Sequence, residues 1–407
     1  MQHPRAAAPA QAGPAPAPGD RRVPDVTPPF RPGFLPALEG LRAVASLGII
    51  GTHVAFQTGH DVGALWERVL GRFDFFVAVF FTLSGFLLWR SNRASRGPGH
   101  WANYYRKRAA RILPAYWVLV LVVLLAFPVG ADAGWRAWLA NLTLTQVFVP
   151  DGLHGGLTHL WSLSVEVSFY VVMPLLVMAL GRIDPVRSQW VRIGAIAALT
   201  ALSFGWAWLP LPYPDGVNPH VQPAAYFSWF AAGMVLAELE SLAGHPDPRH
   251  RAQLEAMQRW ASRRWIWLLV AAGALVLAAG LGPEGLVQLT DWEFLRRLWC
   301  GLVFGAAIIG PWAISPDSRV LASPVVQALG RWSYGIFLWH MALLSVVFPL
   351  LGINLFDGGL IPVWIATTAL TIPVAGASYA LVEEPARRWL GRVWAEARRD
   401  SAATSSS

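Results

Sequence analysis

The chain has 407 residues, of which 55% are hydrophobic and only 14% are charged, whereas soluble domains carry about a quarter charged residues. This composition excludes an ordinary soluble globular protein and predicts that lipid surrounds most of the chain. The net charge of +8 lies in short clusters between apolar runs and not in one basic domain, so we do not expect nucleic acid as a partner.

The opening segment, residues 1–36, is rich in Pro and Ala and contains no apolar run that resembles the core of a signal peptide. We therefore predict a disordered cytosolic tail here. Because no cleavable signal precedes it, we expect the first apolar stretch to enter the membrane and remain there.

Ten apolar stretches are each close to the roughly 20 residues that cross a bilayer as a helix. They lie at residues 38–56, 73–90, 112–128, 161–180, 191–209, 223–240, 265–281, 295–313, 332–351 and 360–382. The sequence predicts an all-α polytopic bundle of about ten transmembrane helices, with the membrane domain at residues 37–392 and a disordered cytosolic tail at residues 393–407. The single cysteine, Cys300, excludes an intrachain disulfide, and we predict no metal site.

The distribution of Arg and Lys predicts the orientation, because short loops that carry these residues are seldom translocated. Residues 90–111 connect two spans and contain basic residues but no acidic ones, whereas the connections at residues 210–222 and 352–359 contain one Asp each. We therefore expect a multi-pass protein of the plasma membrane with both termini in the cytosol. Arg296 and Arg297 disagree with this count because they fall at an outer end; a pair with Asp291 or Glu293, or a misplaced span, would explain them.

The first span contains two ionisable residues, Arg42 and His53, eleven residues apart. Eleven residues are close to three turns and roughly 16 Å of helix, so the two side chains share one face. Taken separately, each residue has a structural interpretation. The Arg42 side chain would reach the cytosolic interface, and His53 would cap the outer end of the helix. Their common face, beside Gly48 and Gly51, favours a function.

The fourth span contains Glu166, which we expect about two turns into the membrane at a depth similar to that of His53. A buried carboxylate requires a partner. One that holds a neutral imidazole would support general-base catalysis, because it fixes the tautomer and stabilises the imidazolium. A structural ion pair, or a protonated carboxyl bonded to Ser162 or Ser164, is the alternative.

Two further features have structural as well as functional interpretations. His340 lies inside the ninth span, where a single histidine is most often a hydrogen-bonded core residue. The cluster that contains Arg108 and Arg111 is typical of a topology signal, and it also suits phosphate, which guanidinium groups bind bidentately. For the arginine cluster, the topology signal and the phosphate site are compatible interpretations.

Several motifs, in the right order over residues 37–392, resemble those of the acyltransferase-3 family. They are Glu39-Gly40-Leu41-Arg42 with the Arg-to-His spacing, Phe80-Phe81-Thr82-Leu83-Ser84-Gly85-Phe86, Arg108-x-x-Arg111 followed by Ile112-Leu113-Pro114, Trp161-Ser162-Leu163-Ser164-Val165-Glu166, Ser333-Tyr334-Gly335 through His340, and Val382-Glu383-Glu384-Pro385.

The resemblance implies ten core spans and transfer of an acyl group from cytosolic acyl-CoA, often acetyl-CoA, to a hydroxyl of an envelope sugar, glycolipid or secondary metabolite. On this sequence it implies phosphate binding by Arg108 and Arg111, with Arg42 just above. His53 would be the base that Glu166 orients, and both direct transfer and an acyl-histidine stay open. We assign Ser84, Ser164, Tyr334 and His340, which belong to the same motifs, to the substrate pocket; Ser84 and Gly85 also suit close packing of the second span. Acyl-CoA is expected as a donor substrate and not as a permanently bound cofactor.

Two features depart from the family pattern. Members often have two consecutive carboxylates after Trp-Ser-Leu-Ser-Val, but here Val167 follows Glu166. Many members also carry a fused soluble domain, which we do not expect in this chain.

The main alternative is a proton-coupled transporter or flippase, since buried His and Glu in a helical bundle also suit proton coupling. Matching Gly or Pro interruptions in two halves, which would indicate inverted repeats, are absent from the sequence. A structural scaffold would leave the ionisable residues unexplained. We therefore favour the enzyme.

Overall fold

The computed structural model describes residues 33–95, 97–183, 189–209, 211–244, 247–283, 285 and 287–404. Most of the N-terminal tail predicted at residues 1–36 lies outside these ranges. The first helix, α1, begins at Pro36.

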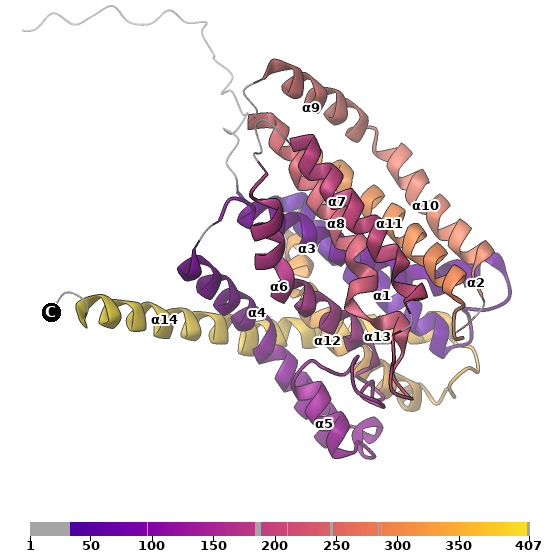
Figure 1. Ribbon diagram of the computed structural model, residues 1–407. Coiled ribbons are helices and arrows are strands. Elements are labelled where there is room, and N and C mark those ends of the chain that lie inside the picture. Colours follow the sequence, from indigo (N-terminus) through magenta and orange to yellow (C-terminus); the bar gives the residue numbers. More distant parts are fainter. Residues whose placement is uncertain are drawn as a thin grey trace, which may run out of the picture. The chain divides into compact units, whose positions relative to one another are not determined.

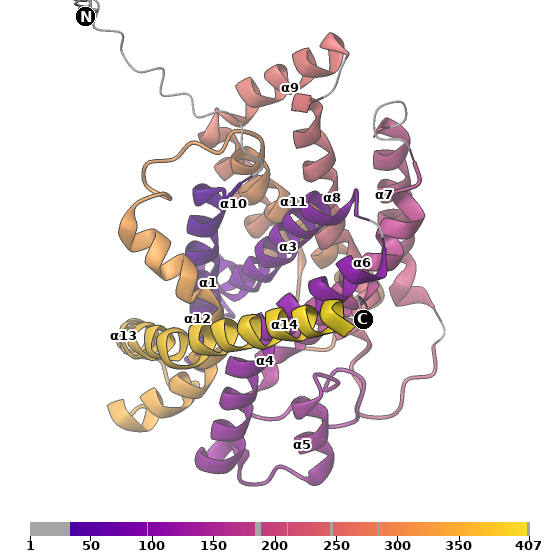
Figure 2. The ribbon, with the colours of Figure 1, turned by 90° about the vertical axis from the view of Figure 1, so that its left-hand side faces the viewer.

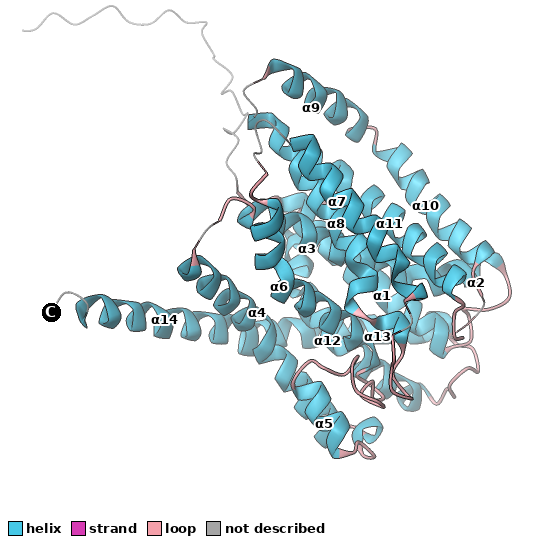
Figure 3. Ribbon diagram, viewed as in Figure 1, coloured by secondary structure: helices cyan, strands magenta, loops and turns pink. Residues whose placement is uncertain are grey.

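Within the described ranges the regular structure is entirely helical, so the predicted all-α class is confirmed (Figure 3). The α-helices are α1 (Pro36–Gln57), α2 (Leu65–Gly71), α3 (Phe76–Asn92), α4 (Pro98–Ala126), α5 (Trp135–Leu142), α6 (Trp161–Leu180), α7 (Gln189–Phe204), α8 (Phe227–Glu240), α9 (Pro248–Ala261), α10 (Arg264–Leu281), α11 (Asp291–Ile314), α12 (Pro324–Leu351), α13 (Leu360–Ser378) and α14 (Glu384–Thr404). Short 3₁₀ turns connect several of them.

All ten predicted apolar stretches coincide with helices, namely α1, α3, α4, α6, α7, α8 and α10 to α13. Among the described residues, seven helical segments are long and apolar enough to cross a membrane. They are Leu65–Asn92, Pro98–Ala126, Thr158–Leu180, Arg264–Leu281, Asp291–Ile314, Pro324–Leu351 and Leu360–Trp394. The remaining three are less suited, because α7 and α8 have 16 and 14 residues and α1 carries Glu39, Arg42 and His53. The structure therefore supports an integral membrane protein, and ten spans stay a prediction.

The basic segment at residues 90–111 differs from the connecting loop that the sequence predicts. The helix α4 begins at Pro98, so Arg108 and Arg111 lie on a helix and not in a loop. Proline suits the first turn of a helix, because a backbone N–H at that position has no partner within the helix and its absence costs nothing. As a result, Arg108 and Arg111 are three residues apart on one helical face and can act on the same ligand.

Helix α3 lies between α8, α11, α1 and α6 (Figure 1). Its contact with α8 depends on glycine, because a Cβ at Gly85 would lie 2.0 Å from the carbonyl oxygen of Phe230. A Cβ at Gly233 would lie 1.9 Å from the carbonyl oxygen of Thr82. The Thr82 hydroxyl also donates to the Trp229 carbonyl at 3.0 Å. The close packing that the sequence suggests for Gly85 is thus present.

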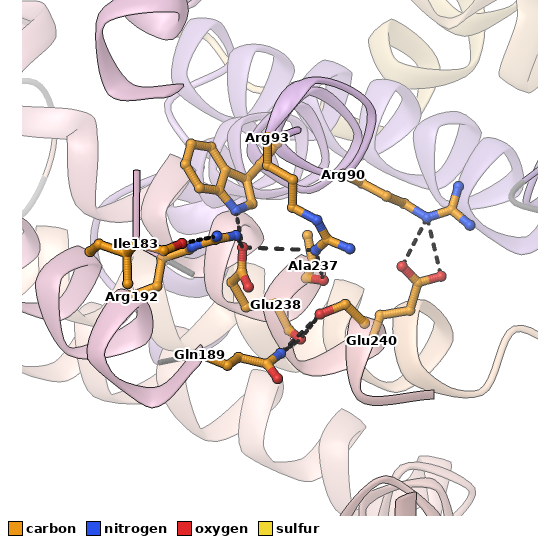
Figure 4. A network of polar contacts seen from close by, with 10 residues as sticks. Arg90, Arg93, Ile183, Gln189, Arg192, Ala237, Glu238 and Glu240 are labelled. Atoms are coloured by element: carbon orange, nitrogen blue, oxygen red, sulfur yellow. Dashed lines mark hydrogen bonds and ion pairs between the residues drawn. The ribbon is translucent and has the colours of Figure 1, made fainter. Parts of the chain in front are cut away.

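A buried charge network ties the end of α3 to α7 and α8 (Figure 4). Glu238 has no exposed surface and accepts hydrogen bonds from Trp89 Nε1 at 2.6 Å and from Arg192 at 3.0 Å. Arg90 pairs with Glu240 at 2.9 Å. Such pairs are costly to break one partner at a time, so the network fixes the end of α3 and with it the side chains on that helix.

The chain leaves α13 through a π-helical turn at Tyr379–Glu383 and continues as α14, which lies beside α4 (Figure 2). Residues 393–404, which the sequence assigns to a disordered tail, are helical here. Their Ala, Glu and Arg residues have high helix propensity. Residues 405–407 of that tail lie outside the described ranges.

Candidate active site

A cavity of about 730 Å³ contains most of the arginines that the sequence singles out, and we call it the arginine chamber. Its wall is formed by α1, α3, α4, α6 and α12. The polar side chains in the wall are Arg42, Ser84, Arg108, Arg111, Ser162, Glu166, Tyr170, Ser333 and Tyr334. The predicted residues Arg42, Arg108, Arg111, Glu166, Ser84 and Tyr334 therefore meet in one place.

Arg42 extends from α1 across the chamber wall to α12. Its Nε donates to the Ser333 hydroxyl at 3.2 Å and lies 3.9 Å from a carboxylate oxygen of Glu39. The guanidinium also lies 5.7 Å from the centre of the Phe80 ring. The Arg42 side chain is only 13% exposed, and its ion pair with Glu39 is long. Its guanidinium therefore keeps N–H donors for a ligand in the chamber.

Arg108 and Arg111 enter the same chamber from α4. Arg108 lies over the rings of Tyr104 and Tyr170, at 6.0 and 5.8 Å from their centres. Its buried Nε has no hydrogen-bond partner among the described residues. A guanidinium held by aromatic rings in this way can bind an anion with its free donors.

Glu166 extends from α6 into the arginine chamber and is held by two hydroxyl groups. The Ser84 hydroxyl and the Tyr170 hydroxyl each donate to its Oε1 at 2.5 Å. The second oxygen, Oε2, accepts no hydrogen bond from the described residues, so it is available to a ligand N–H or O–H.

A second cavity, of about 990 Å³, contains His53 and is called the histidine chamber. It lies where α1, α2 and α3 approach the segment between α10 and α11. Its ionisable residues are His53, Asp61, Arg68, Arg72, Asp74, His159 and Arg297. Burial raises the pKa of the Asp61 carboxyl above its ordinary value, although Arg72 partly opposes the shift.

His53 is part of a cluster of three histidines. Its ring centre lies 5.1 Å from that of His340 and 6.5 Å from that of His159, and the last two are 4.8 Å apart. His159 Nε2 lies 3.1 Å from the Leu338 carbonyl oxygen, and His340 Nδ1 lies 2.7 Å from the Phe337 carbonyl oxygen.

These two contacts determine where each ring carries its proton. A carbonyl oxygen only accepts, so neutral His159 and His340 place their protons on the bonded nitrogens. His159 Nδ1 and His340 Nε2 are then unprotonated, buried and without a partner among the described residues. Both lone pairs belong to the cluster that contains His53 and could receive a proton that His53 carries. Among the described residues, no group of three or more His, Cys, Asp and Glu side chains is arranged to hold a metal ion.

Asp74 is the carboxylate that acts electrostatically on His53. It begins the second predicted span and pairs with Arg297 of α11. Its other oxygen, Oδ1, is buried and has no hydrogen-bond partner among the described residues. The pair also accounts for Arg297 at the outer end of a span, although its partner is Asp74 and not Asp291 or Glu293.

The two chambers adjoin. Their walls share Ile49, Val77, Ser162 and Phe337, and the Phe337 ring lies 5.2 Å from that of His159. These four residues form what we call the junction. The arginine chamber and the histidine chamber meet there.

The predicted pairing of His53 with Glu166 is wrong. Glu166 lines the arginine chamber, whereas His53 lies in the histidine chamber near His159. His159 precedes Glu166 by seven residues, which is about 10 Å of helix at about 1.5 Å per residue. His53 therefore lies at the level of His159, about two turns away from the depth that the sequence predicts for it beside Glu166.

Two of the residues assigned to the substrate pocket lie outside both chamber walls. Ser164 is buried, and its hydroxyl has no hydrogen-bond partner among the described residues. His340 is fully buried, beside His53 but behind the chamber surface. Tyr334 does line the arginine chamber, where its hydroxyl donates to the Ile112 carbonyl at 2.9 Å.

Two residues of the histidine chamber, Asp74 and His159, are not among those that the sequence predicts for the site. Asp74 could have been found, because it is an ionisable residue inside the predicted span 73–90. His159 stands just before the Trp-Ser-Leu-Ser motif and had no local signal beyond its position.

Comparison with known proteins places the chain in a family. Residues 35–381 match the acyltransferase domain that defines the acyltransferase-3 family. Acyltransferase MdmB of Streptomyces mycarofaciens is 28% identical over 385 residues, which cover 88% of this chain and 93% of that protein. Exopolysaccharide production protein ExoZ of Rhizobium meliloti is 26% identical and covers 83% of this chain and 94% of its own length.

A third relative is longer than this chain. Peptidoglycan O-acetyltransferase OatA of Listeria monocytogenes is 24% identical over 391 residues, which cover 87% of this chain and 56% of OatA. The chain thus spans little more than half of that protein. On the family match and these relatives, the chain belongs to the acyltransferase-3 family and is an O-acyltransferase.

Proposed function

We propose that this membrane protein transfers an acyl group, in particular acetyl, from cytosolic acyl-CoA to a hydroxyl of an extracytoplasmic carbohydrate or glycolipid. The observation that carries the proposal is the junction, across which a cationic chamber adjoins a chamber with a histidine. This arrangement lets a thioester and a hydroxyl approach each other from opposite sides.

The arginine chamber suits the donor. Arg108 and Arg111 bind phosphate groups of CoA near the cytosolic face, and Arg42 binds deeper along the path. The pantetheine arm then extends towards the junction. Glu166, held by Ser84 and Tyr170, accepts a hydrogen bond from an amide N–H of that arm. Glu166 thereby acts on the donor and not on His53.

The histidine chamber suits the acceptor and the base. His53 takes the proton from the acceptor hydroxyl while its oxygen attacks the thioester carbonyl carbon. The tetrahedral intermediate collapses, the C–S bond breaks, and the proton on His53 passes to the departing thiolate of CoA. Asp74 stabilises the imidazolium that forms in between.

The orientation and the location belong to the proposal. The positive-inside pattern supports both termini in the cytosol, and the family supports the plasma membrane as the site of action. The relatives support a carbohydrate acceptor: the name of OatA states that it acts on peptidoglycan, and that of ExoZ refers to exopolysaccharide. Family membership favours this enzyme over a transporter.

Purified protein incubated with radiolabelled acetyl-CoA tests the proposal. We expect release of CoA, by hydrolysis or transfer, that is lost in His53→Ala because the base is removed, while binding of acetyl-CoA stays within about twofold of the parent. His250→Ala on α9, a histidine in neither chamber, is the matched control and should keep full activity. Activity of His53→Ala within threefold of the parent would refute the general-base role.

A further inference from the structure

A third cavity, of about 830 Å³, lies between α10 and α11 and continues into the histidine chamber. We call it the lateral groove. It shares Arg72, Pro283, Leu289 and Arg297 with the histidine chamber. The two cavities therefore adjoin at a pair of arginines.

The outer part of the lateral groove is apolar and faces lipid. Its walls include Leu277, Leu281 and Trp299, which are 52%, 50% and 50% exposed. Both α10 and α11 are among the segments that are long and apolar enough to cross a membrane, so exposed apolar side chains on them contact acyl chains. A hydrocarbon chain can thus enter the groove directly from the bilayer.

The inner end of the groove is cationic. The buried Nε atoms of Arg72 and Arg297 have no hydrogen-bond partner among the described residues, and Arg296 also lines the groove. Arg72 does donate from Nη2 to the Pro283 carbonyl at 2.6 Å. The guanidinium groups of Arg72 and Arg297 thus lie where the groove meets the histidine chamber.

The acidic residues nearby leave two of these arginines without an ion pair among the described residues. Asp74 is paired with Arg297, and Glu293 accepts at 2.8 Å from both the backbone N–H and the hydroxyl of Thr290. No carboxylate of the described residues lies within ion-pair distance of Arg72 or Arg296. Both arginines lie at the outer end of a predicted span, where the distribution of Arg elsewhere in the chain would not put them. An anionic ligand would pair with them.

We propose that the acceptor is a lipid with a phosphate in its headgroup, which enters sideways through the lateral groove. Its hydrocarbon chain lies along α10 and α11, its phosphate binds Arg72, Arg296 and Arg297, and the rest of its headgroup presents a hydroxyl to His53. A water-soluble acceptor would need no opening towards lipid. The inference rests on the proposed function, because it specifies the class of acceptor for the same chemistry.

Photolabelling in lipid nanodiscs tests this entry. The full-length protein is placed in phosphatidylcholine nanodiscs with a small fraction of phosphatidylglycerol, whose headgroup has both a phosphate and free hydroxyls and which carries a diazirine on its acyl chain. Labelled peptides are mapped by mass spectrometry. We expect labels to concentrate on residues 277–281 and 295–299. Excess unlabelled phosphatidylglycerol should compete, whereas excess phosphatidylcholine or inorganic phosphate should not.

Arginine variants provide the second arm. Arg296→Gln, and Arg72→Gln with it, should lower labelling of the groove by about threefold or more, because charge-assisted hydrogen bonds to phosphate are lost. Arg331→Gln on α12, an exposed arginine in none of the three cavities, is the matched control. We leave Arg297 unchanged, since its removal would strand Asp74. Labels spread evenly over the lipid-facing helices, or unaffected by these variants, would overturn the inference.

Turnover of acetyl-CoA in the same nanodiscs separates the two proposals. Turnover that depends on His53 without labels in the groove would overturn lateral entry and leave the proposed function intact. Labels in the groove without such turnover would overturn the acceptor role of the bound lipid, and with it the proposed function.

Discussion

Arg42 and His53 share one face of α1, yet they line different chambers. In the proposed mechanism, their separation of about three turns is the distance from the site of the donor phosphates to the base. The structure adds the residues around them: Ser333 beside Arg42, and His340 and His159 beside His53. The chemistry is thus distributed along one helix, with the junction between its two ends.

At the residue scale, substitution of the two carboxylates, Asp74 and Glu166, should change different kinetic constants. Asp74→Asn should lower kcat by about 10- to 100-fold with little change in the KM for acetyl-CoA, because the imidazolium of His53 loses its compensating charge. Glu166→Gln should instead raise that KM, because in the proposed mechanism Glu166 contacts the donor. Steady-state kinetics of both variants check this.

The opposite pattern would contradict the assignment of the two acids. A kcat loss confined to Glu166→Gln would return the base-orienting role to that residue. Because Asp74 also pairs with Arg297, retention of the parent's elution profile on size exclusion must accompany the kinetic result.

Among the elements, α4 determines which basic residues face the arginine chamber. It is one helix from Pro98, so its basic residues have fixed directions: Arg108 and Arg111 line the arginine chamber, whereas Lys107 does not. Arg108→Ala or Arg111→Ala should raise the KM for acetyl-CoA by about tenfold, since a hydrogen bond to a charged group contributes about 1.5–3 kcal/mol.

Lys107→Ala is the control for α4, because it removes a charge from the same cluster without touching the chamber. Initial rates over a range of acetyl-CoA concentrations make the comparison. If Lys107→Ala and Arg108→Ala had equal effects, the cluster would act only through its general charge, and phosphate binding would have to be abandoned.

The contact between α3 and α8 places Ser84 in the arginine chamber and depends on close backbone approach. Gly233→Ala should destabilise the protein by about 1–3 kcal/mol, because the added Cβ meets the Thr82 carbonyl and the backbone must shift. Gly273→Ala on α10, where no atom lies within 4 Å of the added Cβ, should be neutral. Thermal unfolding in detergent compares the two; equal melting temperatures would contradict the packing argument.

For the whole molecule, the sequence predicts the helical class, the positions of the apolar stretches and most of the polar residues that line the arginine chamber. Arg42 and Glu166 could be identified because ionisable residues in apolar runs are costly unless they serve a role, and Ser84 because it belongs to a motif that resembles the family. The motifs that carry the family resemblance contain all three.

The division into two chambers could not be predicted in the same way. Spacing along one helix is known from the sequence, but the relative depth of two helices depends on where each begins and how they tilt. The depth predicted for His53 relative to the fourth span differs by about two turns from that in the structure. The sequence therefore pairs His53 with Glu166, whereas its neighbours are His159 and His340. The Asp74–Arg297 pair joins segments more than 200 residues apart, which no local pattern reveals.

The path of the thioester through the two chambers is the central claim, and a cryo-electron microscopy structure with a non-hydrolysable thioether analogue of acetyl-CoA tests it most directly. We predict the phosphates at Arg108 and Arg111, the pantetheine arm beside Glu166, and the acyl carbonyl at the junction formed by Ile49, Val77, Ser162 and Phe337. An analogue whose acyl group ends away from the junction, with no route to His53, would contradict the account.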